Sequence, residues 1–292
     1  GLCVLLILGF GAALARSPLL SPGSYQVPPG AVQESSPRRH NVLWIVLDTV
    51  RADHMSCYGY ERHTTPFLED WARQAIVFDH AVADGIWTLP SHASMFTGLS
   101  TREHGVHANH TWLDDGITTV ADVLTANGFT TASFSNNHLI ARHTNLAKGF
   151  EECCVMGHAR RMSRFSLEHL CESWGITPMF PWLDGDFGAA LTNHVISNWL
   201  DERTDEKRPF FLFVNYMDAH LPYRVPKRYR RMFMTEPQVH RSYDLRQSVF
   251  GNLLVSLTKR FNIEGGEFIT EPDREVVKKQ YSAAIRYLDD RV

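Results

Sequence analysis

Two nearly unbroken apolar runs, residues 41–47 and 209–216, constrain the fold of this 292-residue chain more than any other feature. Both runs are rich in β-branched or aromatic side chains and lack the polar alternation of a strand that faces water on one side. Such runs are typical of strands buried on both faces of a parallel sheet. They predict an α/β architecture in which helices cover the sheet on each side.

Helix and strand signals alternate around these two runs. Thr65 is the expected cap of a helix that begins with Pro66, and a helix from 118–119 is expected to stop at Gly128. Further expected elements are strands at 76–83 and 129–134 and helices at 187–200 and 271–292. The stretches 153–184 and 224–270 show no clear period, so we expect an insertion in the first and irregular structure in the second.

The stretch Trp87–Gly98 places a hydroxyl residue beside the start of a short helix. Pro90 is tolerated in a first helical turn, and Ser91 is a candidate cap for the free amides of that turn. Thr88 would then stand just before a helix N-terminus, where amide donors and the helix dipole favour an anionic group. This position suits a nucleophile that attacks a phosphate or sulfate ester. It equally suits an ordinary buried threonine in a loop-to-helix joint.

Candidate polar groups follow the predicted strands at the edge where open α/β sheets bind their ligands. They are Asp48 after the first run, Asn136 and His138 after the strand at 129–134, and Asp218 and His220 after the last run. A carboxylate at such a place is costly unless it is paired, hydrogen-bonded or bound to a metal. A turn or helix cap would also explain Asp48, and a histidine bonded only to backbone would explain His220.

Asp48 and Thr88 together suggest a divalent metal ion. A threonine hydroxyl is a weak nucleophile at neutral pH and needs a metal or a base to activate it. A cation held by the Asp48 carboxylate and the Thr88 oxygen would activate the hydroxyl and polarise the ester. These two oxygen ligands are too few for a complete site, and they leave the choice among Ca, Mg, Mn and Zn open.

The start of the chain and its charge bear on location and partners. The apolar run at 2–14 has the length of a signal-peptide core, so residues 1–15 are expected to be a truncated signal peptide, with an uncleaved anchor as the rival. Residues 16–39 are proline- and serine-rich and predict a linker. We therefore expect an exported protein, with membrane attachment only if an anchor is retained. The net charge of −3 indicates no nucleic-acid partner.

A series of motifs, in order along the chain, resembles the sulfatase family of the alkaline phosphatase superfamily. The motifs are residues 41–53, Tyr58–Gly59, 64–68, 88–98, His104–Val106, 129–138, 211–223 and 281–290. The resemblance covers residues 40–292 and implies a mixed, mostly parallel sheet flanked by helices on both faces. It also implies the N-terminal part of a catalytic domain that is incomplete at its C-terminus, because the family's remaining metal ligands lie beyond the helix that ends near Asp290.

Four positions depart from the sulfatase pattern, and the first is Thr49, where the family has a second aspartate beside Asp48. The family carries a cysteine or serine, oxidised to formylglycine, where this chain has Thr88, an arginine where it has His92, and a lysine where it has Asn136. Threonine cannot be converted to that aldehyde, so the resemblance argues against formylglycine chemistry here. Threonine at this position is instead similar to the phosphoglycerol and phosphoethanolamine transferases of the superfamily, which form a phospho-threonine-type intermediate with a divalent metal.

The resulting hypothesis is a metal-dependent hydrolase or transferase of sulfate or phosphate esters that uses Thr88 as its nucleophile. His220 and His138 would take catalytic roles, with His220 donating to the leaving group, while His92 and Asn136 would contact the anionic ester. The substrate would be a small molecule or a glycan or lipid ester. The alternative is a catalytically inactive sulfatase-like binding protein, or a fragment that is inactive by itself.

Overall fold

The computed structural model describes residues 40–156, 186–203, 208–221, 223–250 and 270–292. Its strands are β1 (Val42–Leu47), β2 (Thr130–Ser135), β3 (Glu152–Val155) and β4 (Phe210–Tyr216). They form one sheet in the order β1–β4–β2–β3, and each neighbouring pair is parallel. The predicted α/β class and the strands expected at 41–47, 129–134 and 209–216 are confirmed. The leader predicted at 1–15 and the linker at 16–39 lie outside the described residues.

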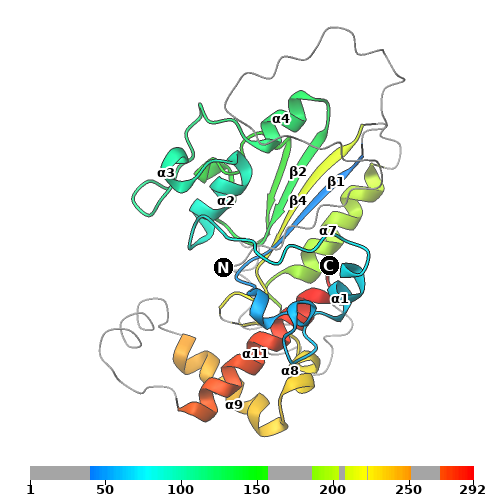
Figure 1. The fold of residues 1–292 in the computed structure, drawn as a ribbon, viewed down its shortest axis with the longest axis vertical. Helices are drawn as coiled ribbons and strands as arrows, with labels where there is room; N and C mark the ends of the chain where they lie inside the picture. Colours follow the sequence, from blue (N-terminus) through cyan, green and yellow to red (C-terminus); the bar gives the residue numbers. More distant parts are fainter. Residues whose placement is uncertain (1–39, 157–185, 204–207, 222, 251–269) are drawn as a thin grey trace.

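Helices cover both faces of this sheet (Figure 1). On one face, residues such as Val46 and Phe213 pack against α2 (Thr88–Thr97) and α4 (Val120–Ala126). On the other face, residues such as Ile45 and Leu212 pack against α7 (Ala189–Glu202) and α11 (Glu271–Asp289). Because successive side chains of a strand point to opposite faces, strands between two helical layers need apolar residues at every position. This burial explains the two unbroken apolar runs.

Four further helices complete the described part of the fold. They are α1 (Pro66–Ala72), α3 (Thr101–His104), α8 (Lys227–Phe233) and α9 (Glu236–Phe250), and three 3₁₀ turns lie at Ala52–His54, Ser56–Tyr58 and Arg142–Thr144. Helices α8 and α9 contact α11 and lie beside it at one end of the molecule (Figure 1). Among the described helices, none combines the length and hydropathy that a membrane span requires.

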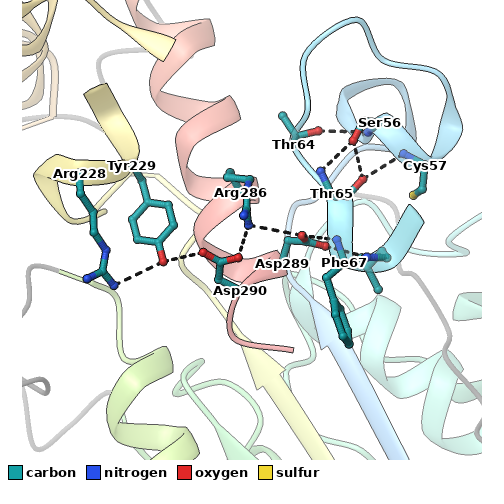
Figure 2. A network of polar contacts seen from close by, with 11 residues as sticks. Ser56, Cys57, Thr64, Thr65, Phe67, Arg228, Tyr229, Arg286, Asp289 and Asp290 are labelled. Carbon is teal, nitrogen blue, oxygen red and sulfur yellow. Dashed lines mark hydrogen bonds and ion pairs between the residues drawn. The ribbon is translucent and has the colours of Figure 1, made fainter. Parts of the chain in front are cut away.

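The end of α11 holds the beginning of α1 (Figure 2). The Asp289 carboxylate accepts the backbone N–H groups of Phe67 and Leu68 at 2.8 and 3.0 Å. Thr65 is the N-cap residue of this helix, as expected, but its hydroxyl accepts the Cys57 N–H at 3.0 Å and makes no cap bond. A carboxylate from a distant helix satisfies the free amides, so the cap was not visible in the local sequence.

Two further expectations about secondary structure are wrong. Residues 76–83 form no strand, and their apolar side chains are exposed, with Val82 at 94% of its full accessibility. The stretch at 224–270 contains the helices α8 and α9 within its described part, so it is not irregular. The first residues of the insertion expected over 153–184 belong to β3, which pairs with β2, and the insertion stays a prediction because residues 157–184 lie outside the described part.

Candidate active site

The candidate site lies at the carboxyl ends of three adjacent strands. Asp48 follows β1, and its N–H donates to the Tyr216 carbonyl of β4 at 2.9 Å. Asn136 follows β2, and its N–H donates to the Asn215 carbonyl of β4 at 3.0 Å. Since β4 stands between β1 and β2, these two bonds bring the polar residues after β1 and β2 to the same edge of the sheet.

Thr88 is the first residue of α2 and approaches this edge from the helix side. Trp87, with φ −149° and ψ 173°, is the N-cap residue. Ser91 is not the cap that the sequence suggested, because it lies inside the helix and its N–H donates to the Trp87 carbonyl at 3.2 Å. The Thr88 hydroxyl therefore stands at the positive end of a ten-residue helix, where developing negative charge is stabilised.

Asn137 joins Thr88 to Asp48. Its Nδ2 donates to Asp48 Oδ2 at 3.1 Å and to Thr88 Oγ1 at 2.9 Å. Its Oδ1 accepts the Leu139 N–H at 3.0 Å, and this bond fixes which end of the amide faces the two oxygens. One buried amide group thus holds a carboxylate oxygen and a hydroxyl oxygen side by side.

A cavity of about 140 Å³ opens onto these groups. Its lining combines the candidate catalytic groups with the loop before α2: Val46, Asp48, Thr49, Gly85, Ile86, Trp87, Thr88, Ser91, His92 and His220. Gly85 brings this loop close to the helix, since a Cβ built there would lie 2.5 Å from the backbone nitrogen of Ser91. The cavity wall therefore depends on a residue without a side chain at this point.

Thr49 beside Asp48 adopts a conformation unusual for its type. Its φ of 61° lies in the left-handed region, which costs a β-branched residue about 1–3 kcal/mol. Its hydroxyl donates to the Ala219 carbonyl at 2.9 Å, and its carbonyl accepts the Tyr281 hydroxyl at 2.6 Å. Burial raises the pKa of Tyr281 to about 12, so this phenol stays protonated and remains a donor at neutral pH. These bonds hold the turn that carries Asp48.

The two histidines of the cavity differ in their surroundings. The buried His92 donates from Nδ1 to the Thr88 carbonyl at 2.8 Å, and its Nε2 lies 3.5 Å from the Asn215 amide nitrogen. Burial lowers the pKa of His92, which favours the neutral ring, although the nearby Asp48 opposes this shift. The half-buried His220 donates from Nδ1 to the Leu221 carbonyl at 2.7 Å, so Nε2 is the nitrogen with which it can meet a substrate.

The structure does not bring Asn136 and His138 to the cavity wall. The buried Asn136 accepts the Thr192 hydroxyl of α7 at 2.9 Å, and His138 is exposed. Asp218 is buried, and it accepts the Phe187 N–H at 2.6 Å just before α7. The residues that do meet around the cavity are Thr88, Asp48, His92 and His220, together with Asn137, which the sequence analysis did not identify.

The oxygens of Asp48 and Thr88 are the donor type that hard divalent cations prefer. Asp48 is 9% exposed, and no ion pair among the described residues includes it. A nearly buried carboxylate with one amide donor is a costly arrangement that a cation would offset. Within the described ranges no cluster of three or more His, Cys, Asp or Glu side chains is present, so Asp48 and Thr88 would be part of a ligand set.

Comparisons with known proteins agree with this fold. The N-acetylglucosamine-6-O-sulfatase of Bacteroides thetaiotaomicron is 24% identical over 64% of this chain and 32% of its own length. The phosphonate monoester hydrolase of Agrobacterium radiobacter superimposes with a TM-score of 0.60 and 19% identity, over 87% of this chain and 57% of that one. The periplasmic domain of EptC from Escherichia coli, in complex with Zn, gives a TM-score of 0.50 and 16% identity, over 85% and 56%.

This chain thus spans less than two thirds of the length of these relatives. The structural matches confirm the expected α/β fold. The model of the sulfatase family matches residues 40–292, which is most of the chain. The chain therefore belongs to the sulfatase family.

Proposed function

We propose that this chain carries the nucleophile-bearing part of an enzyme that hydrolyses or transfers sulfate or phosphate esters through Thr88, without formylglycine. One observation carries the proposal. The Thr88 hydroxyl stands at the N-terminus of α2, opens onto the cavity and shares the Asn137 amide with the Asp48 carboxylate. A nucleophile, an acidic ligand and a helix dipole thus converge on one point.

In the proposed reaction, the Thr88 hydroxyl loses its proton to solvent, and Oγ forms a bond to the sulfur or phosphorus atom while the ester bond to the leaving-group oxygen breaks. His220 gives that oxygen the Nε2 proton of its doubly protonated ring and keeps the Nδ1 proton on the Leu221 carbonyl. The free amides of the first turn of α2 favour the negative charge that develops on the transferred group. Water or an acceptor hydroxyl then takes the group from Thr88. A catalytic role for His138 and a substrate contact for Asn136 stay predictions.

We further propose that Asp48 and Thr88 supply two ligands of a divalent cation. When bound, such a cation lowers the pKa of the Thr88 hydroxyl and polarises the ester. The support is the donor chemistry of the two oxygens and the absence of an ion pair for Asp48 within the described residues. Zn is named for the EptC domain, and it joins Mg, Mn and Ca as a candidate here.

The proposed substrate is a small-molecule, glycan or lipid ester. Relatives of this chain are named for a sugar sulfate and for phosphonate monoesters, so both sulfur and phosphorus centres fit the family. A threonine nucleophile favours phosphorus, since formylglycine cannot form from it. The apolar run at 2–14 supports a further proposal that the protein acts after export, with membrane attachment if that run is an uncleaved anchor.

The experiment that tests this proposal measures turnover of an aryl phosphate and an aryl sulfate by the full-length protein with Mg, Mn, Ca and Zn. Thr88→Ala should abolish turnover. Thr97→Ala is the matched control, because Thr97 lies at the other end of α2 and donates its hydroxyl to the Ala93 carbonyl. Equal turnover by wild type and Thr88→Ala would refute the nucleophile assignment. Ester binding without turnover under every metal condition would favour the inactive binding protein instead.

A further inference from the structure

Thr88 is held from two sides by buried polar side chains. On the backbone side, His92 donates from Nδ1 to the Thr88 carbonyl at 2.8 Å. On the side-chain side, Asn137 donates to Thr88 Oγ1 at 2.9 Å. A helical threonine has two accessible χ1 rotamers, so a donor aimed at Oγ1 selects one of them. A bond to the carbonyl of the same residue fixes the peptide plane from which that side chain extends.

The two contacts are connected beneath Thr88. Nδ2 of Asn215, near the end of β4, lies 3.5 Å from His92 Nε2. The Ser135 hydroxyl, at the end of β2, donates to the Asn137 carbonyl at 2.9 Å, accepts the Asn137 N–H at 3.0 Å and lies 3.4 Å from Asn215 Oδ1. The path therefore closes on itself, from the Thr88 carbonyl through His92, Asn215, Ser135 and Asn137 to the Thr88 hydroxyl.

Each member of this path is inaccessible to water. His92 is 2% exposed, Asn137 is 3% exposed, and Ser135 and Asn215 are fully buried. Buried polar groups cost free energy unless they are hydrogen-bonded, and partly satisfied networks are worse than apolar cores. Here the groups satisfy one another, and edge-on contacts of the His92 ring with Phe96 and Phe213 fix the orientation of the imidazole.

We propose that His92, Asn215, Ser135 and Asn137 form a closed polar ring that positions Thr88 as the nucleophile, with His92 a positioning residue that does not contact the ester anion. The inference deepens the proposed function and rests on it. Both His92 nitrogens are used inside the protein, one as a donor to the Thr88 carbonyl and one as an acceptor from Asn215. An arginine at this place has no acceptor atom and could not take the Asn215 N–H.

Three substitutions of His92 in the full-length protein separate the two ring nitrogens. His92→Asn keeps a donor near the position of Nδ1, His92→Gln keeps a polar group near the position of Nε2, and His92→Leu keeps neither. We expect kcat to fall about tenfold in the Asn variant, because the remaining hydrogen bond is less well aligned. We expect a fall of about 100-fold in the Gln and Leu variants, because the nucleophile is misplaced. KM should change little in all three variants, since the His92 side chain makes no contact with the substrate.

The matched control is His104→Leu. His104 is also buried, and it bonds through Nε2 to Ser94 and accepts the Val106 N–H at 3.0 Å, away from the cavity lining. This variant should lose thermal stability and keep its kcat. The inference is overturned if His92→Gln keeps more activity than His92→Asn, if all three variants match wild type, or if KM rises while kcat is unchanged.

A second measurement does not depend on activity. Nitrogen-15 NMR of the histidine rings in the wild-type protein reports which ring nitrogen carries the proton. From the closed polar ring we expect that His92 is protonated on Nδ1 and that Asn215→Leu changes the chemical shift of His92 Nε2. A proton on Nε2 would overturn the inference whatever the enzyme does. If His92 is protonated on Nδ1 but the protein turns over no ester, the closed polar ring is supported and the proposed function is refuted.

Discussion

Replacing Asn137 with leucine tests the link between the nucleophile and the acidic ligand. Leucine has the same number and branching of side-chain non-hydrogen atoms as asparagine, so the change removes polar atoms without opening a cavity. The Nδ2 donor to Asp48 and Thr88 is lost, and so is the Oδ1 acceptor for the Leu139 N–H. Two effects are expected, a loss of stability and a loss of turnover.

The stability loss follows from the three bonds. The bond to the Asp48 carboxylate is worth about 1.5–3 kcal/mol, and the bonds to Thr88 and from Leu139 about 0.5–1.5 kcal/mol each. Thr88 is half-buried, so water replaces part of that bond, and a total near 3 kcal/mol is expected. For a domain of this size, this corresponds to a fall in melting temperature of about 6–12 °C. The freed Thr88 rotamer should lower kcat about 100-fold.

The assay compares kcat, KM and melting temperature of full-length wild type, Asn137→Leu and Asn145→Leu. Asn145 is a matched control because its amide also donates twice, to the Leu113 carbonyl at 2.7 Å and to Asp115 at 2.8 Å, but neither of these partners is Asp48 or Thr88. Both variants should melt at a lower temperature, and only Asn137→Leu should lose kcat. Unchanged kcat in Asn137→Leu, or equal loss in both variants, would refute the reasoning.

Three further predictions concern the cavity wall, the core and the response to pH. Gly85→Ala should cost about 1–3 kcal/mol and lower kcat, because the new Cβ meets the Ser91 backbone at 2.5 Å; wild-type kcat and melting temperature would contradict this close approach. Phe213→Ala should cost about 3–5 kcal/mol in urea unfolding, since Phe213 is fully buried; a loss below about 1 kcal/mol would contradict its packing. Hydrogen bonds from Arg241 lower the pKa of Asp273, so its contribution to stability is present above the unfolded pKa of about 3.9 and is lost as pH falls through the lower folded value. Melting temperature against pH should therefore fall less steeply in this acidic range for Asp273→Asn than for wild type, and parallel curves would refute the pairing.

The sheet was predictable where burial on both faces leaves a mark in the sequence. β1 and β4 are apolar at nearly every position, and both were expected within a residue or two of their observed limits. β3 has four residues, begins with Glu152 and depends on a distant partner, so no local pattern identifies it. Residues 76–83 have the composition of a strand, but among the described residues no strand pairs with them.

The helices α8 and α9 were missed for a related reason. Arg230 of α8 is 1% exposed, and its guanidinium donates to the Val225 carbonyl and to the Ser242 hydroxyl. A helix that buries charged and polar groups shows no simple apolar stripe, so its period is hidden until the tertiary partners are known. These contacts come from the packing of α8, α9 and α11 and not from local propensity.

The sequence was sufficient to predict the site residues that lie at the strand ends and at the start of α2. Asp48, Thr88 and His220 each lie where the fold class alone directs a polar group toward the ligand edge. The choice between Asn136 and Asn137 was not predictable, because adjacent residues in a turn point in different directions. The turn sends Asn136 to Thr192 and Asn137 to Thr88, and only the backbone geometry decides between them.

We expect Thr88 to become covalently modified during turnover. Full-length protein is mixed with an aryl phosphate or aryl sulfate and each metal, quenched in acid after a short time and analysed by peptide mass spectrometry. The account predicts a phosphoryl or sulfuryl group on Thr88 in wild type, and no modified peptide from residues 88–98 in Thr88→Ala. Turnover with no group on Thr88, or the same modification on another residue in both proteins, would contradict it.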